Sequence, residues 1–170
     1  IYRILKKDFG FDQFKPLQEQ IIRNVLSKKN SLVLMPTGGG KSICYQLPAL
    51  ILDGTALVIS PLIALMKDQV ENLRANGIDA AFINSSLSGM EEESITTNCL
   101  NGVYKLLYLS PEKALSLMET WLPTLNVSLI AIDEAHCISQ WGHDFRPEYT
   151  RLKSIREVFP STPVIALTAT

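Results

Sequence analysis

The sequence predicts an α/β fold in which a doubly wound, mainly parallel sheet carries helices on both faces. Two observations predict it: short, almost continuous apolar runs recur along the chain, and segments with helical periodicity lie between them. Strands that are apolar along their whole length are typical of parallel sheets, because helices cover both faces. A content of 46% apolar residues in 170 is enough for a sizeable core, so we expect one domain over residues 1–170.

The expected strands and helices alternate along the chain. The strands are short runs rich in Leu, Ile, Val and Ala, at residues 31–35, 56–60, 80–83, 106–110, 129–133 and 164–168. Between the second and third runs, Leu62, Met66, Val70 and Leu73 repeat with helical spacing, and Gly77 is placed to end that helix. Similar helical segments, several with Pro or Ser at the start, cover residues 16–27, 41–52, 88–100, 111–117 and 148–159.

Net charge and cysteine usage limit the class of protein. Sixteen Lys and Arg against seventeen Asp and Glu give a net charge of −1, so any site for a polyanion must be local. The longest apolar stretches are far shorter than the roughly 18 residues of a membrane span, and we expect no membrane partner. Cys44, Cys99 and Cys137 lack C-x-x-C spacing, which favours reduced thiols and therefore a protein inside a cell. The expected compartment is the nucleus in a eukaryote, or the cytoplasm and nucleoid in a bacterium. The chain opens at Ile1 without a methionine, and we interpret it as a piece of a longer protein.

Polar and glycine-rich segments follow most of the expected strands. In open parallel sheets, ligands bind beyond the carboxyl ends of the strands, so this edge is the expected site. After the first strand, Gly38, Gly39 and Gly40 let the backbone turn its N–H groups and a helix N-terminus toward an anion. Lys41 adds a mobile charge for terminal phosphates and Ser42 a hydroxyl for Mg²⁺. The segment is a P-loop with Met35 where the first glycine usually lies; a glycine-rich turn with an exposed lysine is the weaker alternative.

Two adjacent carboxylates close the fifth expected strand. At the ligand edge, Asp133 would hold Mg²⁺ directly or through water, and Glu134 would orient and deprotonate the water that attacks the γ-phosphorus. The alternative is that both are ordinary loop acids. His136, Cys137 and His143 lie close by, but their spacing matches none of the common zinc sites, so we expect no zinc.

Taken together, several motifs resemble those of superfamily-two helicases, and the aromatic-rich loop at residues 138–147 is similar to that of the RecQ family of DNA helicases. The resemblance runs from about residue 9 to residue 170. It implies a RecA-like P-loop NTPase lobe that uses ATP and Mg²⁺. It also implies single-stranded and branched DNA as partners, together with a second helicase lobe absent from this chain. The motifs are residues 36–42, 60–69, 108–112, 133–136 and 168–170.

The resemblance implies a set of nucleotide-binding residues. The segment that ends at Gln18 is similar to the family's adenine-recognising motif, in which Gln18 would hydrogen-bond the base edge and Phe11 would stack on its face. Lys15 stands where the family has arginine. Lysine has no planar guanidinium with paired N–H donors, so any bidentate or stacking contact that arginine makes there would be weaker or different. The alternative is an amphipathic N-terminal helix with Phe9 and Phe14 in the core. The full set is Phe11, Lys15, Gln18, Thr37, Gly38, Gly39, Gly40, Lys41 and Ser42.

The resemblance also implies residues that contact DNA or couple it to the ATP site. In the aromatic-rich loop, Trp141 and Phe145 interleave with His143 and Arg146, a mix able to stack on bases and touch phosphates; a core tryptophan is the alternative. His136 would couple hydrolysis to DNA contact, with a structural histidine as the alternative. The remaining candidates are Thr168 and Thr170, as partners of His136, and Ser60 and Lys67, as contacts to DNA phosphates. For Lys67, a solvated helix face is equally open.

The expected function is that of the N-terminal ATPase lobe of an ATP-dependent DNA helicase, with Lys41, Asp133, Glu134 and His136 as catalytic residues. The family resemblance implies unwinding in the 3′–5′ direction. An RNA helicase of the same superfamily would share the P-loop and the acids but lack the aromatic loop. A non-catalytic nucleotide-binding or DNA-binding interaction module would keep the fold without turnover. Because no arginine finger is recognisable, we expect this chain alone to bind nucleotide weakly and to hydrolyse it slowly.

Overall fold

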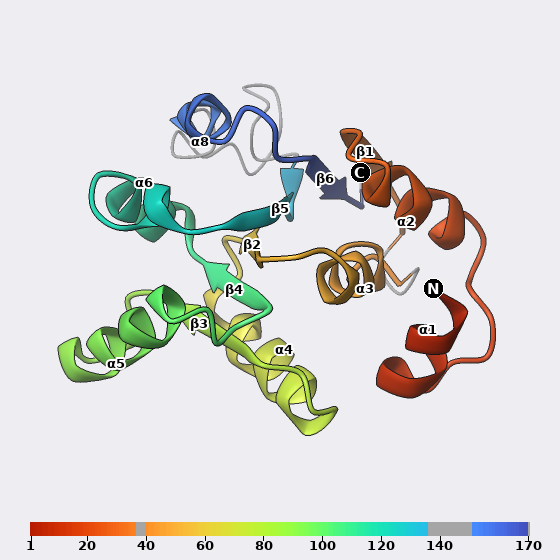
Figure 1. The fold of residues 1–170 in the computed structure, drawn as a ribbon, viewed down its shortest axis with the longest axis horizontal. Helices are drawn as coiled ribbons and strands as arrows, with labels where there is room; N and C mark the ends of the chain where they lie inside the picture. Colours follow the sequence, from red (N-terminus) through yellow and green to blue (C-terminus); the bar gives the residue numbers. More distant parts are fainter. Residues whose placement is uncertain (37–39, 136–150, 170) are drawn as a thin grey trace.

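A six-stranded parallel sheet forms the centre of the molecule (Figure 1). The computed structural model describes residues 1–36, 40–135 and 151–169. The strands lie in the order β1-β6-β5-β2-β4-β3, and each neighbouring pair is parallel. All the expected strands are confirmed, as β1 (Ser31–Leu34), β2 (Thr55–Ile59), β3 (Ala80–Ile83), β4 (Leu106–Leu109), β5 (Val127–Ile132) and β6 (Val164–Thr168).

Helices cover both faces of this sheet, which confirms the doubly wound arrangement. On one face, α3 and α4 pack on a core cluster that includes Tyr45, Met66 and Tyr108. On the other face, α5, α6 and α8 pack on a second cluster that includes Cys99, Leu117 and Ile155. Among the described residues, no helix has the length and apolar character of a membrane span. The helices are α1 (Tyr2–Phe9), α2 (Gln18–Leu26), α3 (Ile43–Ile51), α4 (Ile63–Ala75), α5 (Gly89–Leu100), α6 (Pro111–Met118), the 3₁₀ helix η1 (Leu122–Thr124) and α8 (Lys153–Val158).

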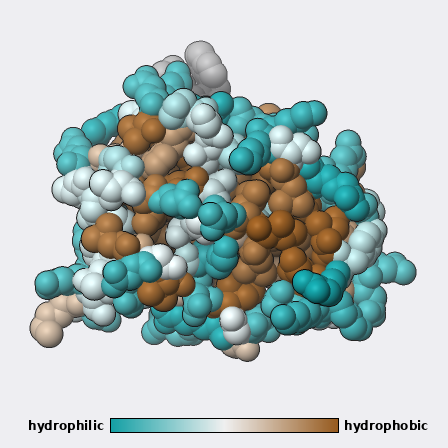
Figure 2. Space-filling model, viewed as in Figure 1, coloured by the Kyte–Doolittle hydropathy of each residue, from teal (hydrophilic) through white to brown (hydrophobic). Residues whose placement is uncertain are grey.

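A small third cluster joins the N-terminal helix to the rest of the fold. Leu5 of α1 is buried against Ile22 of α2 and Leu47 of α3, and Phe9 and Phe14 are packed against these side chains. The helix α1 ends at Phe9, so the segment that leads to Gln18 is not the amphipathic helix weighed as the alternative, although Phe9 and Phe14 do pack as that alternative expected. Figure 2 shows hydrophobic residues gathered over α3 on the viewed face, which agrees with the nearly continuous apolar sequence of this helix.

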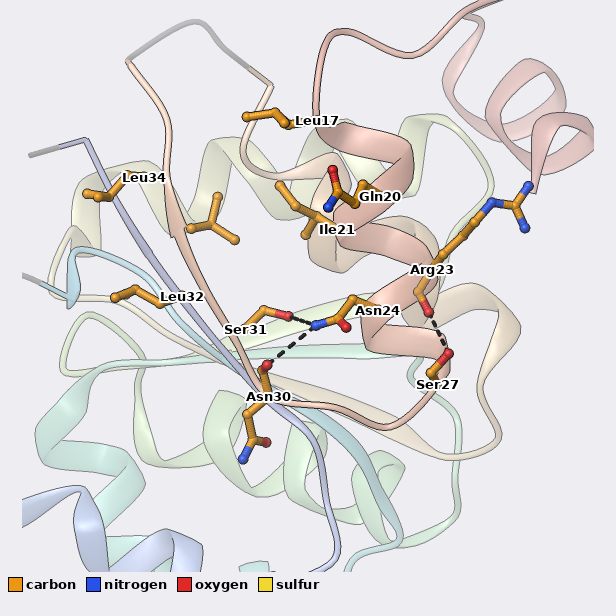
Figure 3. Close-up of a pocket in the computed structure, with 11 residues that line it drawn as sticks. Leu17, Gln20, Ile21, Arg23, Asn24, Ser27, Asn30, Ser31, Leu32 and Leu34 are labelled. Atoms are coloured by element: carbon orange, nitrogen blue, oxygen red, sulfur yellow. Dashed lines mark hydrogen bonds between the residues drawn. The ribbon is translucent and has the colours of Figure 1, made fainter.

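The edge strand β1 corrects the expectation that both faces of every strand are covered. Leu32 and Leu34 are 72% and 64% exposed, although they lie in an apolar run. β1 pairs only with β6 among the described strands, and Figure 3 shows both leucines pointing away from α2, which covers the opposite face. Apolar composition alone could not show this, because a strand at the edge of a sheet and one at its centre can have the same sequence pattern.

The C-terminus of α2 carries a strained cap. Lys28 has φ 62°, in the left-handed region where a side chain clashes with its own backbone. The Lys28 N–H donates to the Val25 carbonyl at 2.8 Å, and the Lys29 N–H to the Asn24 carbonyl at 3.2 Å, a Schellman arrangement in which glycine is the usual residue.

We expect Lys28→Gly to raise the free energy of unfolding by about 1 kcal/mol, because glycine removes the left-handed strain and Lys28 is an exposed residue. Urea denaturation measures the change. Lys29→Gly is the matched control: it adds the same freedom to the unfolded chain without relieving a positive φ, so it should lower stability. Equal effects of the two substitutions would contradict the prediction.

Candidate nucleotide-binding site

The two polar groups that the sequence predicts for a phosphate site lie at one edge of the sheet. Lys41 and Ser42 follow β1 at the start of α3, and Asp133 follows β5. β6 lies between these strands, and the Met35 N–H donates to the Thr168 carbonyl at 3.1 Å. Neighbouring strands are about 4.8 Å apart, so β1 and β5 are separated by about 10 Å. One strand, β6, therefore lies between the strand that precedes the predicted P-loop and the strand that precedes the predicted acids.

The start of α3 has the features of an anion site. Lys41 and Ser42 are both partly exposed. In the described part of the chain, the Ser42 side chain accepts no capping hydrogen bond from α3, which leaves its hydroxyl for a ligand. The Cys44 and Tyr45 N–H groups donate to the Lys41 and Ser42 carbonyls at 3.1 and 3.2 Å. The N–H groups before Cys44 therefore form the positive end of this helix, where phosphate groups bind. Thr37, Gly38 and Gly39 lie outside the described residues, so their phosphate contacts stay predictions.

The predicted adenine motif contacts the phosphate loop through Gln18. This side chain is only 2% exposed. Its Oε1 accepts from the Lys15 N–H at 2.8 Å, and its Nε2 donates to the Gly40 carbonyl at 3.0 Å. A glutamine amide can make four hydrogen bonds, so one N–H and one lone pair remain for a base. Phe11 is half exposed, and its stacking role and the base contact of Gln18 stay predictions.

The acid pair has an unusual backbone. Glu134 has φ 56°, a left-handed conformation that costs a non-glycine residue about 1–2 kcal/mol. Its N–H donates to Asp133 Oδ1 at 3.0 Å, which helps to hold the turn. Residues with a strained backbone of this kind persist only where the surrounding structure holds them in place, and they cluster at functional sites. The turn thus supports a functional role for Glu134 rather than that of an ordinary loop acid.

Ser42 and Asp133 fit a magnesium ion by their chemistry. Mg²⁺ prefers oxygen ligands, usually from one or two carboxylates, and completes its shell with water and phosphate oxygens. Within residues 1–36, 40–135 and 151–169, no three His, Cys, Asp or Glu side chains gather as a metal site. The residues weighed for zinc, His136, Cys137 and His143, lie outside these ranges.

Sequence reasoning missed a group of buried polar side chains beside the site. Tyr45 of α3 and Tyr108 of β4 have their hydroxyls 3.2 Å apart, and both are almost fully buried. Gln46 donates to Tyr108 at 2.9 Å, and Tyr45 donates to Gln69 of α4 at 3.2 Å. Burial raises the pKa of Tyr108 to about 12 and that of Tyr45 well above its usual value. The only sequence signal was two tyrosines in otherwise apolar segments.

The described residues predicted to contact DNA lie in different environments. The Ser60 side chain is buried, and its Oγ accepts from the Leu62 N–H at 3.2 Å, a contact that shapes the turn into α4. Lys67 is exposed on α4, 4.0 Å from Glu71. Thr168 is buried at the end of β6. Their roles toward DNA stay predictions. The other candidates, His136, Trp141, His143, Phe145, Arg146 and Thr170, lie outside the described residues.

Two grooves border α2. One, of about 800 Å³, is lined by Lys15 together with Tyr2 and Phe14, so the predicted adenine motif forms one of its walls. The other, of about 590 Å³, runs between α2 and β1 (Figure 3). There the Asn24 amide donates to Ser31 Oγ at 2.7 Å and ties the helix to the strand. Both grooves form between elements, so no sequence pattern could predict them.

Comparisons with known proteins agree with this arrangement. The profile of the DEAD/DEAH box helicase family matches residues 15–170. The chain is 53% identical over 168 residues to "ATP-dependent DNA helicase RecQ" of Haemophilus influenzae, covering 98% of this chain and 27% of that protein. It is 49% identical over 170 residues to the protein of the same name from Bacillus subtilis, covering 98% of this chain and 29% of that one. The chain thus spans under a third of the length of these relatives.

A solved structure shares the fold. The Mycobacterium smegmatis helicase Lhr, in its complex with ssDNA and AMP-PNP, aligns with a TM-score of 0.77 over 95% of this chain and 23% of that one, at 20% identity. An identity this low supports a common fold only.

We expect Gly40→Ala to lower the free energy of unfolding by about 1–2 kcal/mol. Gly40 has φ +80°, and a Cβ there would lie 2.1 Å from Gln18 Nε2, so the contact between the adenine motif and the phosphate loop would break. Urea denaturation measures the loss. Gly89→Ala is the matched control, since a Cβ at this first residue of α5 meets no described atom within 4 Å; it should be neutral or slightly stabilising. A neutral Gly40→Ala would contradict the close approach.

Proposed function

The chain belongs to the DEAD/DEAH box helicase family, and we propose that it is the first ATPase lobe of a RecQ-type DNA helicase, in which ATP hydrolysis drives strand separation. The observation that carries this proposal is that Lys41 and Ser42 follow β1 and the Asp133–Glu134 pair follows β5, with only β6 between these two strands. In the longer protein, a second lobe would complete the site, and the described residues would form its first half. A DNA-unwinding role places the protein with cellular DNA, in a nucleoid or a nucleus.

Each residue of the site has a distinct part in phosphoryl transfer. Lys41 and the N–H groups at the start of α3 bind the phosphates and offset the charge that develops on them. Ser42 and Asp133 would hold Mg²⁺, and the bound ion would offset negative charge on the phosphates. Glu134 orients the attacking water and accepts its proton, from a backbone held by the contact with Asp133.

DNA binding is the second part of the proposal. The relatives named above are DNA helicases, and the aromatic-rich loop at residues 138–147 resembles the loop that RecQ proteins use to sense single-stranded DNA. We assign contact with single-stranded and branched DNA to this loop and to the exposed Lys67, with 3′–5′ unwinding by similarity to RecQ. His136, Thr168 and Thr170 would couple that contact to hydrolysis.

We expect Glu134→Gln in the full-length protein to preserve ATP binding and to lower kcat about 10²–10⁴-fold, because the substitution removes only the proton acceptor. Lys41→Ala should weaken both binding and turnover, because it removes a charge that contacts the phosphates. Nucleotide binding and phosphate release are measured side by side. Glu119→Gln, at an exposed residue beyond α6, is the matched control and should leave both unchanged. Undiminished turnover by Glu134→Gln would remove its proposed role.

Stimulation of ATP hydrolysis by nucleic acid distinguishes a DNA helicase from an RNA helicase and from a non-catalytic interaction module. A RecQ-type helicase should hydrolyse ATP faster when single-stranded DNA is added and respond weakly to RNA of the same length and sequence. Steady-state ATPase rates of the full-length protein at matched salt concentration provide the comparison, because affinity for both polymers depends on salt. Stronger stimulation by RNA would favour the RNA helicase, and the absence of turnover with either would favour the non-catalytic module.

A further inference from the structure

A chain of four hydrogen-bonded side chains crosses the apolar core between α3 and α4. Gln46 Nε2 donates to the Tyr108 hydroxyl at 2.9 Å, and the hydroxyls of Tyr108 and Tyr45 are 3.2 Å apart. The Tyr45 hydroxyl in turn donates to Gln69 Oε1 at 3.2 Å. Tyr45 and Gln46 lie in the first turns of α3, close to Ser42, so the chain begins beside the proposed phosphate site.

The number of protons on each group shows which side chain donates in each of these hydrogen bonds. A tyrosine hydroxyl has one proton, and the carbonyl oxygen of a glutamine can only accept. Tyr45 therefore donates its proton to Gln69, and the proton between the two hydroxyls comes from Tyr108. Tyr108 then accepts from Gln46, so donation runs from Gln46 through Tyr108 and Tyr45 to Gln69. Both tyrosines must be neutral, as the burial that raises their pKa also requires.

The hydrogen bond from Tyr45 shows how the Gln69 amide is oriented. Because its Oε1 accepts from Tyr45, the group that Gln69 can offer elsewhere is its NH₂. Gln69 also lines a cavity of about 10 Å³ with Ser60, Tyr108 and Asp133. Leu62, Leu65 and Met66 complete its walls. The volume is about the space that one water molecule needs, and the four polar side chains supply partners for it. A carboxylate only accepts hydrogen bonds, so the Gln69 NH₂ and Asp133 are complementary across this cavity.

We propose that Gln69 is a positioning residue for Asp133, holding its carboxylate by an N–H hydrogen bond through one water molecule. The inference rests on the proposed function, which assigns Mg²⁺ to Asp133. Groups that hydrogen-bond a metal ligand from behind fix its orientation and tune its affinity for the metal. Gln69 lies on α4, the helix that carries Lys67, so one hydrogen-bonded chain joins the proposed DNA-contacting helix, the metal carboxylate and the helix that follows the P-loop.

The test measures binding of a fluorescent ATP analogue by the full-length protein as a function of Mg²⁺ concentration. Gln69→Leu keeps the size of the side chain but removes its hydrogen bonds, so we expect the Mg²⁺ concentration for half-maximal binding to rise about 10-fold or more. Binding without Mg²⁺ should stay unchanged, because Gln69 contacts the nucleotide only through Asp133. Glu71→Gln, at an exposed residue of the same helix, is the matched control and should show the original Mg²⁺ dependence.

A second variant covers the case in which Gln69→Leu fails to fold. Gln69→Glu still accepts from Tyr45 but has no N–H group to offer toward Asp133, so it removes the proposed contact and keeps the contact with Tyr45. We therefore expect the Mg²⁺ concentration for half-maximal binding to change in this variant as well. A merely structural role for Gln69 would change thermal stability without moving the Mg²⁺ dependence.

The outcomes separate the inference from the proposed function. If both Gln69 variants match Glu71→Gln in Mg²⁺ dependence, the inference is overturned, even where thermal stability falls. If the unaltered protein shows no Mg²⁺-dependent nucleotide binding, the proposed function fails and the inference fails with it.

Discussion

The burial of both faces of the parallel sheet, at every strand except the edge strand β1, is the constraint on which the site depends. Helices occupy these faces because parallel strands need crossover connections, and they seal the strand interiors in apolar clusters. Polar side chains then gather mainly where the strands end. Lys41, Ser42, Asp133 and Thr168 lie at or beyond the ends of β1, β5 and β6, so the proposed chemistry is concentrated in a few residues at that edge.

The site is held by local contacts that compensate for strain. Glu134 keeps a left-handed backbone beside the Asp133 carboxylate, and Gly40 turns tightly enough for Gln18 to reach its carbonyl. In each case a residue of one predicted motif is held by a partner that the chemistry also uses. Preorganisation of this kind lets charged groups act without rearrangement during the reaction.

Polar groups inside an apolar core are costly unless their hydrogen bonds are made. The Gln46, Tyr108, Tyr45 and Gln69 side chains satisfy one another in sequence, so the core on the α3 and α4 face tolerates them. A core filled with leucine would need no such arrangement. Their position between the proposed phosphate site, the proposed metal carboxylate and α4 gives a functional reason for polar residues at a place where packing alone would not require them.

The sequence by itself determined the strands and most of the helices, because periodicity is a property of neighbouring residues. Its short motifs predicted the P-loop and the acid pair. Its resemblance to RecQ helicases added the adenine motif. Only the tertiary structure decided that β6 separates the P-loop strand from the acid strand, that Gln18 binds the Gly40 carbonyl, that Leu32 and Leu34 are exposed, and that two tyrosines connect α3 to α4. These features join residues that are distant in the chain, and their contacts depend on strand order, which the sequence pattern of a strand does not encode.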